Sequence, residues 1–311
     1  MISGEIPRKM PAVYFDGRLQ LVNNYPIPAL PDDWALIRTL VAGICRTDLE
    51  IIKGYMGFAG ILGHEFVGEV VACAQPAWVG RRVTGEINTA CGHCRMCRQG
   101  LARHCPARSV LGILNQDGCM AGYCQLPVAN LHPVPPDMST DRAAFIEPLS
   151  AACEVLAQLN LTGKEKIVVL GDGRLGILCA WALATVSHNV TLVGHHPEKL
   201  EIARWRSLKT ATTVDVAAGA DIVVEATGKP QGFIDALAVC RPRGTLVLKS
   251  TLASQGELNL APVVINEITV LGSRCGLFKE GIAMLQQHRD MPVERLITAK
   301  YPLALALEAF N

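Results

Sequence analysis

The pattern of apolar and polar residues changes at about residue 150. Before this point, short apolar or alternating runs are separated by prolines and glycines, as is typical of β-strands joined by turns. We expect strands here at residues 12–22, 34–43, 64–73, 81–87 and 122–131. The first part of the chain is therefore predicted to form a mostly β domain with long loops.

After residue 150, apolar strands alternate with helical segments. The run K-I-V-V-L at 166–170 is continuously apolar, as in a strand that is buried on both faces of a sheet. Helices are expected at 174–186 and 197–206, and further strands at 189–193, 221–226, 244–249 and 268–273. Such alternation predicts a doubly wound parallel sheet, so the fold class is α/β with a mostly β first domain.

Composition narrows the range of functions. The 311 residues are enough for two domains. Only 18% of them are charged and the net charge is +1, so we expect no nucleic-acid partner. The apolar run at 177–186 is much shorter than the roughly 20 residues that cross a bilayer, so no membrane association is expected.

Four cysteines lie within a short stretch with the spacing C-x2-C-x2-C-x7-C: Cys91, Cys94, Cys97 and Cys105. Four thiolates complete the tetrahedral coordination of zinc and leave no open position, which favours a structural zinc site. Two alternatives remain. An iron–sulfur cluster is suggested by the proline after Cys105, although ferredoxin spacing has three residues before the last cysteine where this chain has seven. Disulfides or free thiols are the other alternative.

The other eight cysteines are scattered in apolar contexts. Residues 1–10 contain no apolar core and no cleavage site of a signal peptide. Both features favour a reduced protein of the cytoplasm over a secreted, disulfide-bonded one.

A glycine-rich turn follows the strand at 166–170 and opens the next helix. It reads Gly171-Asp172-Gly173-Arg174-Leu175-Gly176, a G-x-G-x-x-G pattern in the context that dinucleotide binding requires. Gly171 allows the tight turn, Gly173 lets a pyrophosphate approach the backbone, and Gly176 lets helix and strand pack closely. The alternative is an ordinary strand–helix turn.

The end of the second strand usually carries an acidic residue that binds the ribose 2′-hydroxyl of NAD. This chain has Gly194, His195 and His196 there, with Lys199 and Arg204 nearby. On charge alone, these residues favour NADP, whose 2′-phosphate a carboxylate would repel. The alternative is that both histidines are solvated turn residues.

Two further motifs precede the cysteine stretch: G-I-C-R-T-D at 43–48 and G-H-E-F-V-G-E-V at 63–70. With the cysteines and the glycine turn, in this order, the chain resembles the zinc-dependent medium-chain alcohol and polyol dehydrogenases. The resemblance implies a GroES-like catalytic domain over 1–146 with a zinc lobe at about 88–108. It also implies a Rossmann coenzyme-binding domain over 147–273 and a return to the catalytic domain over 274–311, with the active site between the two domains.

The resemblance also implies a second, catalytic zinc ion. Cys45 and His64 match the zinc ligands of the family, and Glu65 matches a glutamate that enters or leaves the coordination sphere. Glu147 stands in an E-P-L-S segment similar to that of sorbitol and glucose dehydrogenases, where this glutamate binds zinc directly or through water. Cys153 lies about two turns into the helix that begins at Pro148 and is expected to pack in the protein interior.

Three neighbours of Cys45 match family residues with other tasks. Thr47 corresponds to the hydroxyl that relays the proton of the alcohol, Asp48 to the carboxylate that orients a ligand imidazole, and Arg46 to an arginine directed at the coenzyme pyrophosphate. Two departures stand out. Glu50 replaces the histidine that often completes the proton relay, and the chain looks short after Asn311, where family members usually continue.

These observations predict an enzyme that transfers hydride between an alcohol and NAD(P), with the alkoxide formed at zinc. The expected substrate is a secondary alcohol, a polyol or a sugar. The main alternative is a zinc-stabilised NAD(P)-binding redox sensor without turnover, and a further one is an iron–sulfur electron carrier. By analogy, the strand at 268–273 would pair two copies into a homodimer or homotetramer.

Overall fold

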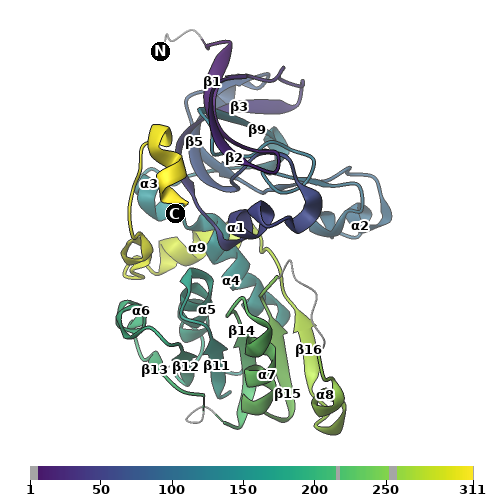
Figure 1. The fold of residues 1–311 in the computed structure, drawn as a ribbon, viewed down its shortest axis with the longest axis vertical. Coiled ribbons are helices and arrows are strands. Elements are labelled where there is room, and N and C mark those ends of the chain that lie inside the picture. Colours follow the sequence, from purple (N-terminus) through teal and green to yellow (C-terminus); the bar gives the residue numbers. More distant parts are fainter. Residues whose placement is uncertain (1–5, 215–217, 252–257, 311) are drawn as a thin grey trace. The chain divides into compact units, whose positions relative to one another are not determined.

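The computed structural model describes residues 6–214, 218–251 and 258–310, and its chain divides into two compact units (Figure 1). Unit 1 contains Met1–Glu147 and Thr298–Asn311, and unit 2 contains Pro148–Ile297. The first boundary lies one residue after the expected one. The return to unit 1 begins at Thr298 and not at 274, because the intervening helix α9 (Phe278–Gln287) belongs to unit 2.

Unit 1 is built from antiparallel sheets. The largest has the strand order β10-β6-β5-β3-β9, and two smaller ones have the orders β2-β1-β4 and β7-β8. The strands are β1 (Lys9–Phe15), β2 (Leu19–Pro26), β3 (Trp34–Gly43), β4 (Gly60–Ile61), β5 (Glu65–Cys73), β6 (Arg82–Gly85), β7 (Asn88–Thr89), β8 (Ser109–Val110), β9 (Tyr123–Pro127) and β10 (Leu131–Pro133). The predicted mostly β character of this unit is confirmed.

The single strand expected at 12–22 is wrong. Gly17 has a φ of +100°, and the chain reverses there, so that Phe15 of β1 pairs with Leu19 of β2. The turn at residues 16–18 is polar, but Val13 and Phe15 before it and Leu19 and Leu21 after it follow one alternation, because both strands pack one face on the same core. The expected strand at 122–131 is likewise divided, by a short 3-10 helix at Val128–Asn130.

The helices of unit 1 are short: α1 (Arg46–Ile52), α2 (Arg95–Arg98), α3 (Thr140–Ala143) and α10 (Ala306–Ala309). Helix α1 begins directly after Cys45, whose backbone N–H donates to the Asp48 carboxylate at 2.7 Å. Its buried face places Ile51 against Val13, Leu62 and other core residues, to which the C-terminal residues Leu303, Ala306 and Phe310 also pack. The core thus fixes the segment that carries the G-I-C-R-T-D motif.

Unit 2 contains a six-stranded parallel sheet in the order β13-β12-β11-β14-β15-β16. Counted along the chain this is 3-2-1-4-5-6, the strand order of dinucleotide-binding folds. Its strands are β11 (Ile167–Leu170), β12 (Val190–Val193), β13 (Lys209–Ala211), β14 (Ala220–Glu225), β15 (Cys240–Leu248) and β16 (Thr269–Gly272). The predicted doubly wound parallel sheet is confirmed.

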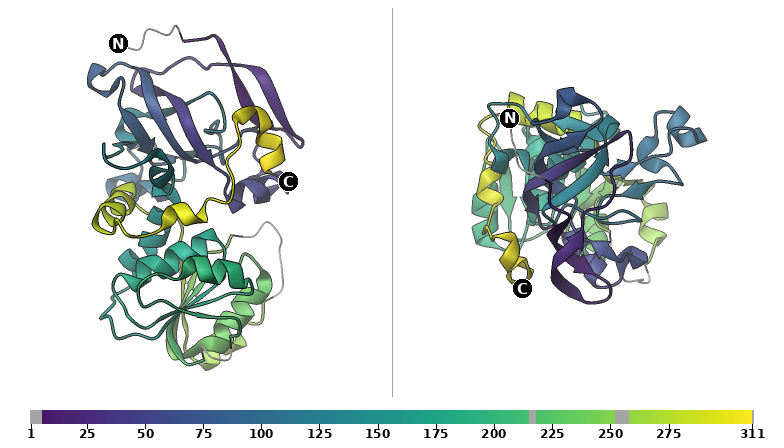
Figure 2. Two further views of the ribbon diagram at one scale, coloured as in Figure 1. Left: turned by 90° about the vertical axis from the view of Figure 1, so that its left-hand side faces the viewer. Right: turned by 90° about the horizontal axis from the view of Figure 1, so that it is seen from above.

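The helices of this part of the chain are α4 (Ile146–Gln158), α5 (Arg174–Ala184), α6 (Pro197–Ala203), α7 (Pro230–Val239), α8 (Ala261–Ile265) and α9. Of these, α5, α6 and α7 contact strands of the sheet, and the left view of Figure 2 shows helices in front of the strands. The central strand β11 is buried along its whole length, as expected for a strand covered on both faces. Trp181 of α5 is fully buried and donates its indole N–H to the Ala203 carbonyl at 2.7 Å, which ties α5 to the end of α6.

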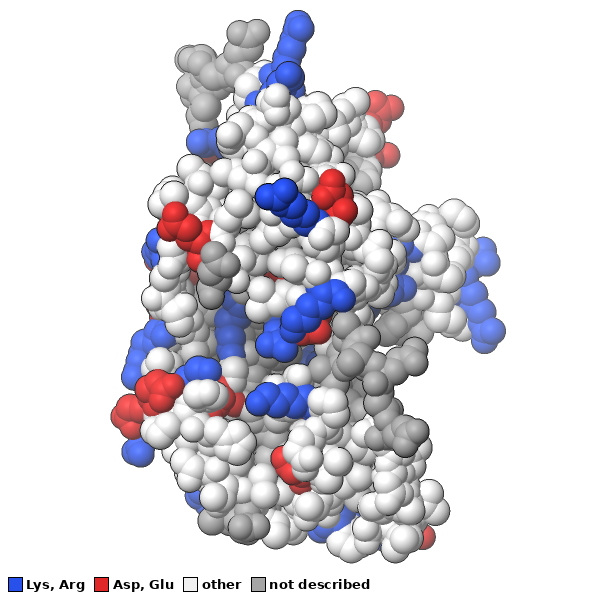
Figure 3. All heavy atoms as spheres, in the orientation of Figure 1, with Lys and Arg blue, Asp and Glu red and all other residues white. Residues whose placement is uncertain are grey.

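The distribution of charge on the surface agrees with the composition. On the face drawn in Figure 3, lysines and arginines are interspersed with acidic residues among a majority of uncharged ones. Within the described ranges, no helix has the length and apolar character needed to cross a membrane.

Candidate metal centres and nucleotide site

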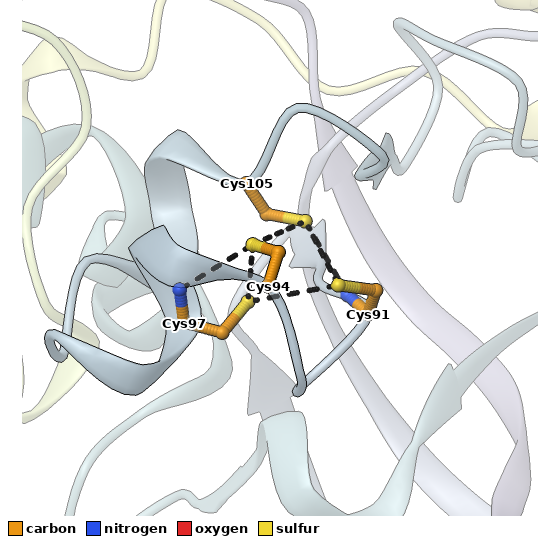
Figure 4. A group of neighbouring side chains, drawn as sticks. All are labelled: Cys91, Cys94, Cys97 and Cys105. Atoms are coloured by element: carbon orange, nitrogen blue, oxygen red, sulfur yellow. Dashed lines mark hydrogen bonds between the residues drawn. The ribbon is translucent and has the colours of Figure 1, made fainter.

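The four clustered cysteines converge on one point in unit 1 (Figure 4). The Sγ atoms are 3.5 Å apart for Cys94 and Cys97, 3.5 Å for Cys91 and Cys105, 3.8 Å for Cys94 and Cys105, and 4.0 Å for Cys91 and Cys97. Corners of a tetrahedron with sulfur about 2.3 Å from zinc are about 3.8 Å apart. The cysteines therefore fit a single tetrahedral ion.

The alternatives for this cluster fit less well. A disulfide requires sulfur atoms about 2.05 Å apart, and all twelve cysteines are free thiols. Spacings of 3.5–4.0 Å also enclose one ion more closely than a cluster of several irons would allow.

The environment of the cluster favours thiolates. Backbone N–H groups of His93 and Cys94 lower the pKa of Cys91 to about 6, and the N–H of Cys97 lowers that of Cys94. Burial and the neighbouring sulfur atoms raise the pKa of Cys97 to about 12. Crowded sulfur atoms thus resist full ionisation by themselves, and a cation among them would relieve that repulsion.

A second group of potential metal ligands lies at the start of α1 and β5. One ligand atom each of Cys45, His64 and Glu65 lies within 4.8 Å of the others. The pairing of β3 with β5 brings the sequence-distant motifs together, since Gly43 lies directly opposite Glu65. A Cβ atom at Gly43 would collide with the Glu65 carboxylate, so only glycine leaves room for it.

The buried carboxylate of Asp48 contacts two members of this second group, the backbone N–H of Cys45 and the imidazole of His64. It is fully buried, and its Oδ1 lies 3.4 Å from Nδ1 of the equally buried His64. Burial lowers the pKa of His64, but the negative charge of the nearby Asp48 outweighs this, so the pKa lies well above its usual value. The same negative charge attracts a metal cation, and Nδ1 facing Asp48 leaves Nε2 to bind it.

The backbone turn before His64 is held by close packing between glycines. Gly63 has a φ of +97°, and a Cβ atom at either Gly112 or Gly118 would collide with the backbone of Gly63. The Cys119 thiol lies nearby, 3.8 Å from the Glu65 carbonyl. These residues escaped the sequence reasoning, because only the folded chain brings residues 112–119 to the turn before His64.

The other expected residues of this site are placed as follows. Thr47 Oγ1 lies 3.7 Å from Cys45 Sγ, within hydrogen-bonding distance for sulfur. The Arg46 guanidinium donates to Glu50 at 2.9 Å and remains largely exposed. Glu147 is buried at the start of α4 but is not among the mutually close ligand atoms of Cys45, His64 and Glu65.

The glycine turn of unit 2 has the shape that its sequence predicts. Gly171 has a φ of +114° and lies against the backbone of Ala226, and Gly176 lies against the Gly171 carbonyl. At Gly173, by contrast, a Cβ atom would meet open space, so the backbone at the start of α5 is accessible. Arg174 and Leu175 form the first residues of α5 and are partly exposed.

The turn after β12 contacts the glycine turn. Gly194 is buried, His195 and His196 are exposed, and Lys199 is partly exposed. The carboxylate of Asp172 accepts a hydrogen bond from the backbone N–H of His196 at 2.7 Å. Sequence reasoning passed over Asp172, because it occupies a variable position of the G-x-G-x-x-G pattern.

Two family models match adjoining parts of the chain. The model described as the alcohol dehydrogenase GroES-like domain matches residues 31–136. The model described as the glucose dehydrogenase C-terminus matches residues 140–311.

The proteins that are similar to this chain in sequence or in structure include several dehydrogenases. L-threonine 3-dehydrogenase of Escherichia coli K12 is 30% identical over 274 residues, which cover 81% of this chain and 80% of the relative. The alcohol dehydrogenase TADH from Thermus sp. ATN1 is 26% identical, with a TM-score of 0.86 over 97% of this chain and 95% of that one. A protein from Sinorhizobium meliloti 1021, provisionally designated a zinc-binding dehydrogenase and bound to NADP, is 24% identical, with a TM-score of 0.87 and the same coverage.

Replacing Cys105 with serine tests the four-cysteine site. We expect the Cys105→Ser variant to contain about one zinc ion fewer per chain, and to lose roughly 2 kcal/mol or more of stability, because three thiolates hold the ion less tightly. Metal analysis and thermal unfolding measure both effects. Cys73→Ser, at a cysteine outside both groups, should change neither. An unchanged metal content in Cys105→Ser, or the visible absorption of an iron–sulfur cluster in the wild type, would contradict the assignment.

Proposed function

We propose, from the premise that the chain belongs to the zinc-dependent medium-chain dehydrogenases, that it interconverts a polar secondary alcohol and its carbonyl compound. As a member of this family it is an NAD(P)-dependent oxidoreductase of the alcohol and polyol dehydrogenase class. The proximity of Cys45, His64 and Glu65 beside the Thr47 hydroxyl carries the proposal.

Three observations favour a polyol, a sugar or a similar hydroxy compound as the substrate. The second half of the chain matches the glucose dehydrogenase model, and Glu147 begins the E-P-L-S segment that this kind of dehydrogenase shares. The relative named L-threonine 3-dehydrogenase is named for carbon 3 of threonine, which bears a secondary hydroxyl.

The chain's own residues would support this reaction in separate ways. Cys45, His64 and a carboxylate from Glu65 or Glu147 would hold a catalytic zinc ion, which supplies the Lewis acidity that lowers the pKa of a substrate hydroxyl. Thr47 would accept the released proton and pass it on. Asp48 would keep His64 in the tautomer that binds metal, and the hydride acceptor is the coenzyme.

The coenzyme would bind at the glycine turn of unit 2. The accessible backbone at Gly173 and the N-terminus of α5 suit a pyrophosphate, which the helix dipole attracts. Further contacts are proposed for Arg46, Gly171, Arg174, Leu175, Gly176, Gly194, His195, His196 and Lys199. The residues after β12 favour NADP over NAD when their charge is considered alone.

We also propose that the enzyme works in the cytoplasm and forms a homodimer or homotetramer. All twelve cysteines are free, which suits a reducing compartment. Strand β16 is the last strand in the order of its sheet, and the apolar residues Val264, Ile265 and Val270 of α8 and β16 are exposed. An apolar strand at a sheet edge is a template for pairing with a second copy.

Steady-state assays test the proposed activity. We expect reduced coenzyme to form, detected by its absorbance, when the zinc-loaded protein is given NAD or NADP and a panel of alcohols, polyols and sugars. Cys45→Ser and His64→Ala should lower kcat/KM by at least about a thousandfold, because zinc Lewis acidity contributes several kcal/mol. Cys73→Ser should retain activity. A protein that binds two zinc ions and the coenzyme but turns over no member of the panel would instead be the redox sensor.

A pair of glutamine variants tests the carboxylate ligands. Glu65→Gln and Glu147→Gln should each weaken zinc binding and lower kcat/KM by about 10–100-fold if both glutamates serve the catalytic ion. Titration with a zinc chelator and steady-state kinetics measure the two effects. Glu69→Gln is the matched control, because Glu69 lies on the same strand as Glu65 but pairs with Arg38 at 2.7 Å. If Glu147→Gln behaves like this control, Glu147 is not a ligand.

A lysine at the sheet edge tests the oligomer. Val270→Lys places a charge on β16 and should convert the wild-type oligomer to monomers, because a lysine on an edge strand opposes pairing. Analytical ultracentrifugation gives the mass. Val186→Lys is the control, at a similarly exposed valine away from this edge. A monomeric wild type, or an unchanged mass for Val270→Lys, would rule out pairing through β16.

A further inference from the structure

The edge of the parallel sheet brings Asp172 to the turn after β12. Strands β11 and β12 are parallel and in register, with Leu170 opposite Val193. The residues that follow them therefore leave the sheet side by side. Gly171 confirms the register by donating its N–H to the Val193 carbonyl at 2.9 Å, and the next residue along the chain is Asp172.

The backbone N–H and the imidazole ring of His196 both contact the carboxylate of Asp172. Its Oδ2 accepts the backbone N–H of His196 at 2.7 Å and faces the imidazole Nδ1 at 3.0 Å. Burial raises the pKa of Asp172, but these hydrogen bonds and the charge of His196 outweigh it, so the pKa lies below its usual value. The side chain is therefore a carboxylate at neutral pH.

Gly194 explains why the chain has no acidic residue at the end of β12. A Cβ atom at Gly194 would collide with Cβ, Cγ and Oδ2 of Asp172. The space in which a side chain at 194 would begin is thus filled by the carboxylate of residue 172. An acidic group is present at the end of β12, but the turn after β11 supplies it.

This carboxylate has the capacity to accept another hydrogen bond. Each of its two oxygens has two lone pairs, and the contacts with His196 use only part of them. The side chain is 11% exposed, so it is not sealed from a ligand.

We propose that Asp172 is the residue that recognises the adenosine ribose of the coenzyme and makes the enzyme prefer NAD to NADP. The inference rests on the proposed binding of a dinucleotide at the glycine turn. The carboxylate accepts a hydrogen bond from the ribose 2′-hydroxyl and repels a 2′-phosphate in the same place. It reverses the preference expected from Gly194, His195 and His196 alone.

Binding of coenzyme fragments tests this role without turnover. Isothermal titration calorimetry of the zinc-loaded, full-length protein compares ADP-ribose with 2′-phospho-ADP-ribose. We expect the wild type to bind ADP-ribose at least about tenfold more tightly, because a hydrogen bond to a charged group is lost in the phosphorylated fragment. In Asp172→Asn the ratio of the two dissociation constants should fall by about tenfold or more, through weaker binding of ADP-ribose and tighter binding of the phosphorylated form.

Asp221→Asn is the matched control. Asp221 also accepts a backbone N–H, from Lys166 at 2.7 Å, and a side-chain donor, Arg241, at 2.6 Å. It lies at the opposite, amino end of the sheet, at the start of β14. Its loss should leave the ratio unchanged. Gly194→Ala is a second probe, because its methyl group displaces the Asp172 carboxylate and should lower the ratio as Asp172→Asn does.

The outcomes separate the inference from the function on which it rests. If the wild type binds both fragments and prefers the phosphorylated one, the role of Asp172 is overturned, and this comparison needs no variant. Equal weakening of both fragments in a folded Asp172→Asn would reduce Asp172 to a support for the turn, and would overturn it too. If neither fragment binds to the wild type, the proposed coenzyme site fails together with the inference.

Discussion

The repulsion between closely spaced, ionisable thiol and carboxyl groups is the main physical constraint on unit 1. Four sulfur atoms lie 3.5–4.0 Å from their neighbours in one place. A thiol, an imidazole backed by a buried carboxylate and a further carboxylate meet in the other. Thiolates and carboxylates repel one another when they are close together, and burial makes the repulsion stronger. A divalent cation turns each cluster from a source of instability into a link between segments that are distant in the sequence.

Much of this molecule could be predicted because its signals are local. The four cysteines lie within fifteen residues and the glycine turn within six, so their spacing alone describes their geometry. The continuous burial of β11 likewise follows from its apolar run. Strand β13 was missed because Lys209–Ala211 is a short, partly exposed segment at the sheet edge, without the pattern of a buried strand. The turn at Gly17 was missed because the alternation of apolar residues keeps the same phase before and after it.

What escaped prediction depends on contacts between distant segments. Gly112 and Gly118 look like ordinary loop glycines in the sequence, yet the turn at Gly63 that precedes His64 packs directly on them. Asp172 looks like a variable residue of a glycine pattern, and only the register of β11 with β12 shows where its carboxylate lies. The sequence motifs thus identified the candidate ligands and the glycine turn, whereas the contacts that support them could be identified only from the folded structure.

Asp172 and Gly194 have a consequence for how this chain could change. The two positions share one volume, so they can hold one acidic side chain between them but not two. Redesign of the nucleotide pocket therefore has to treat positions 172 and 194 as a single unit.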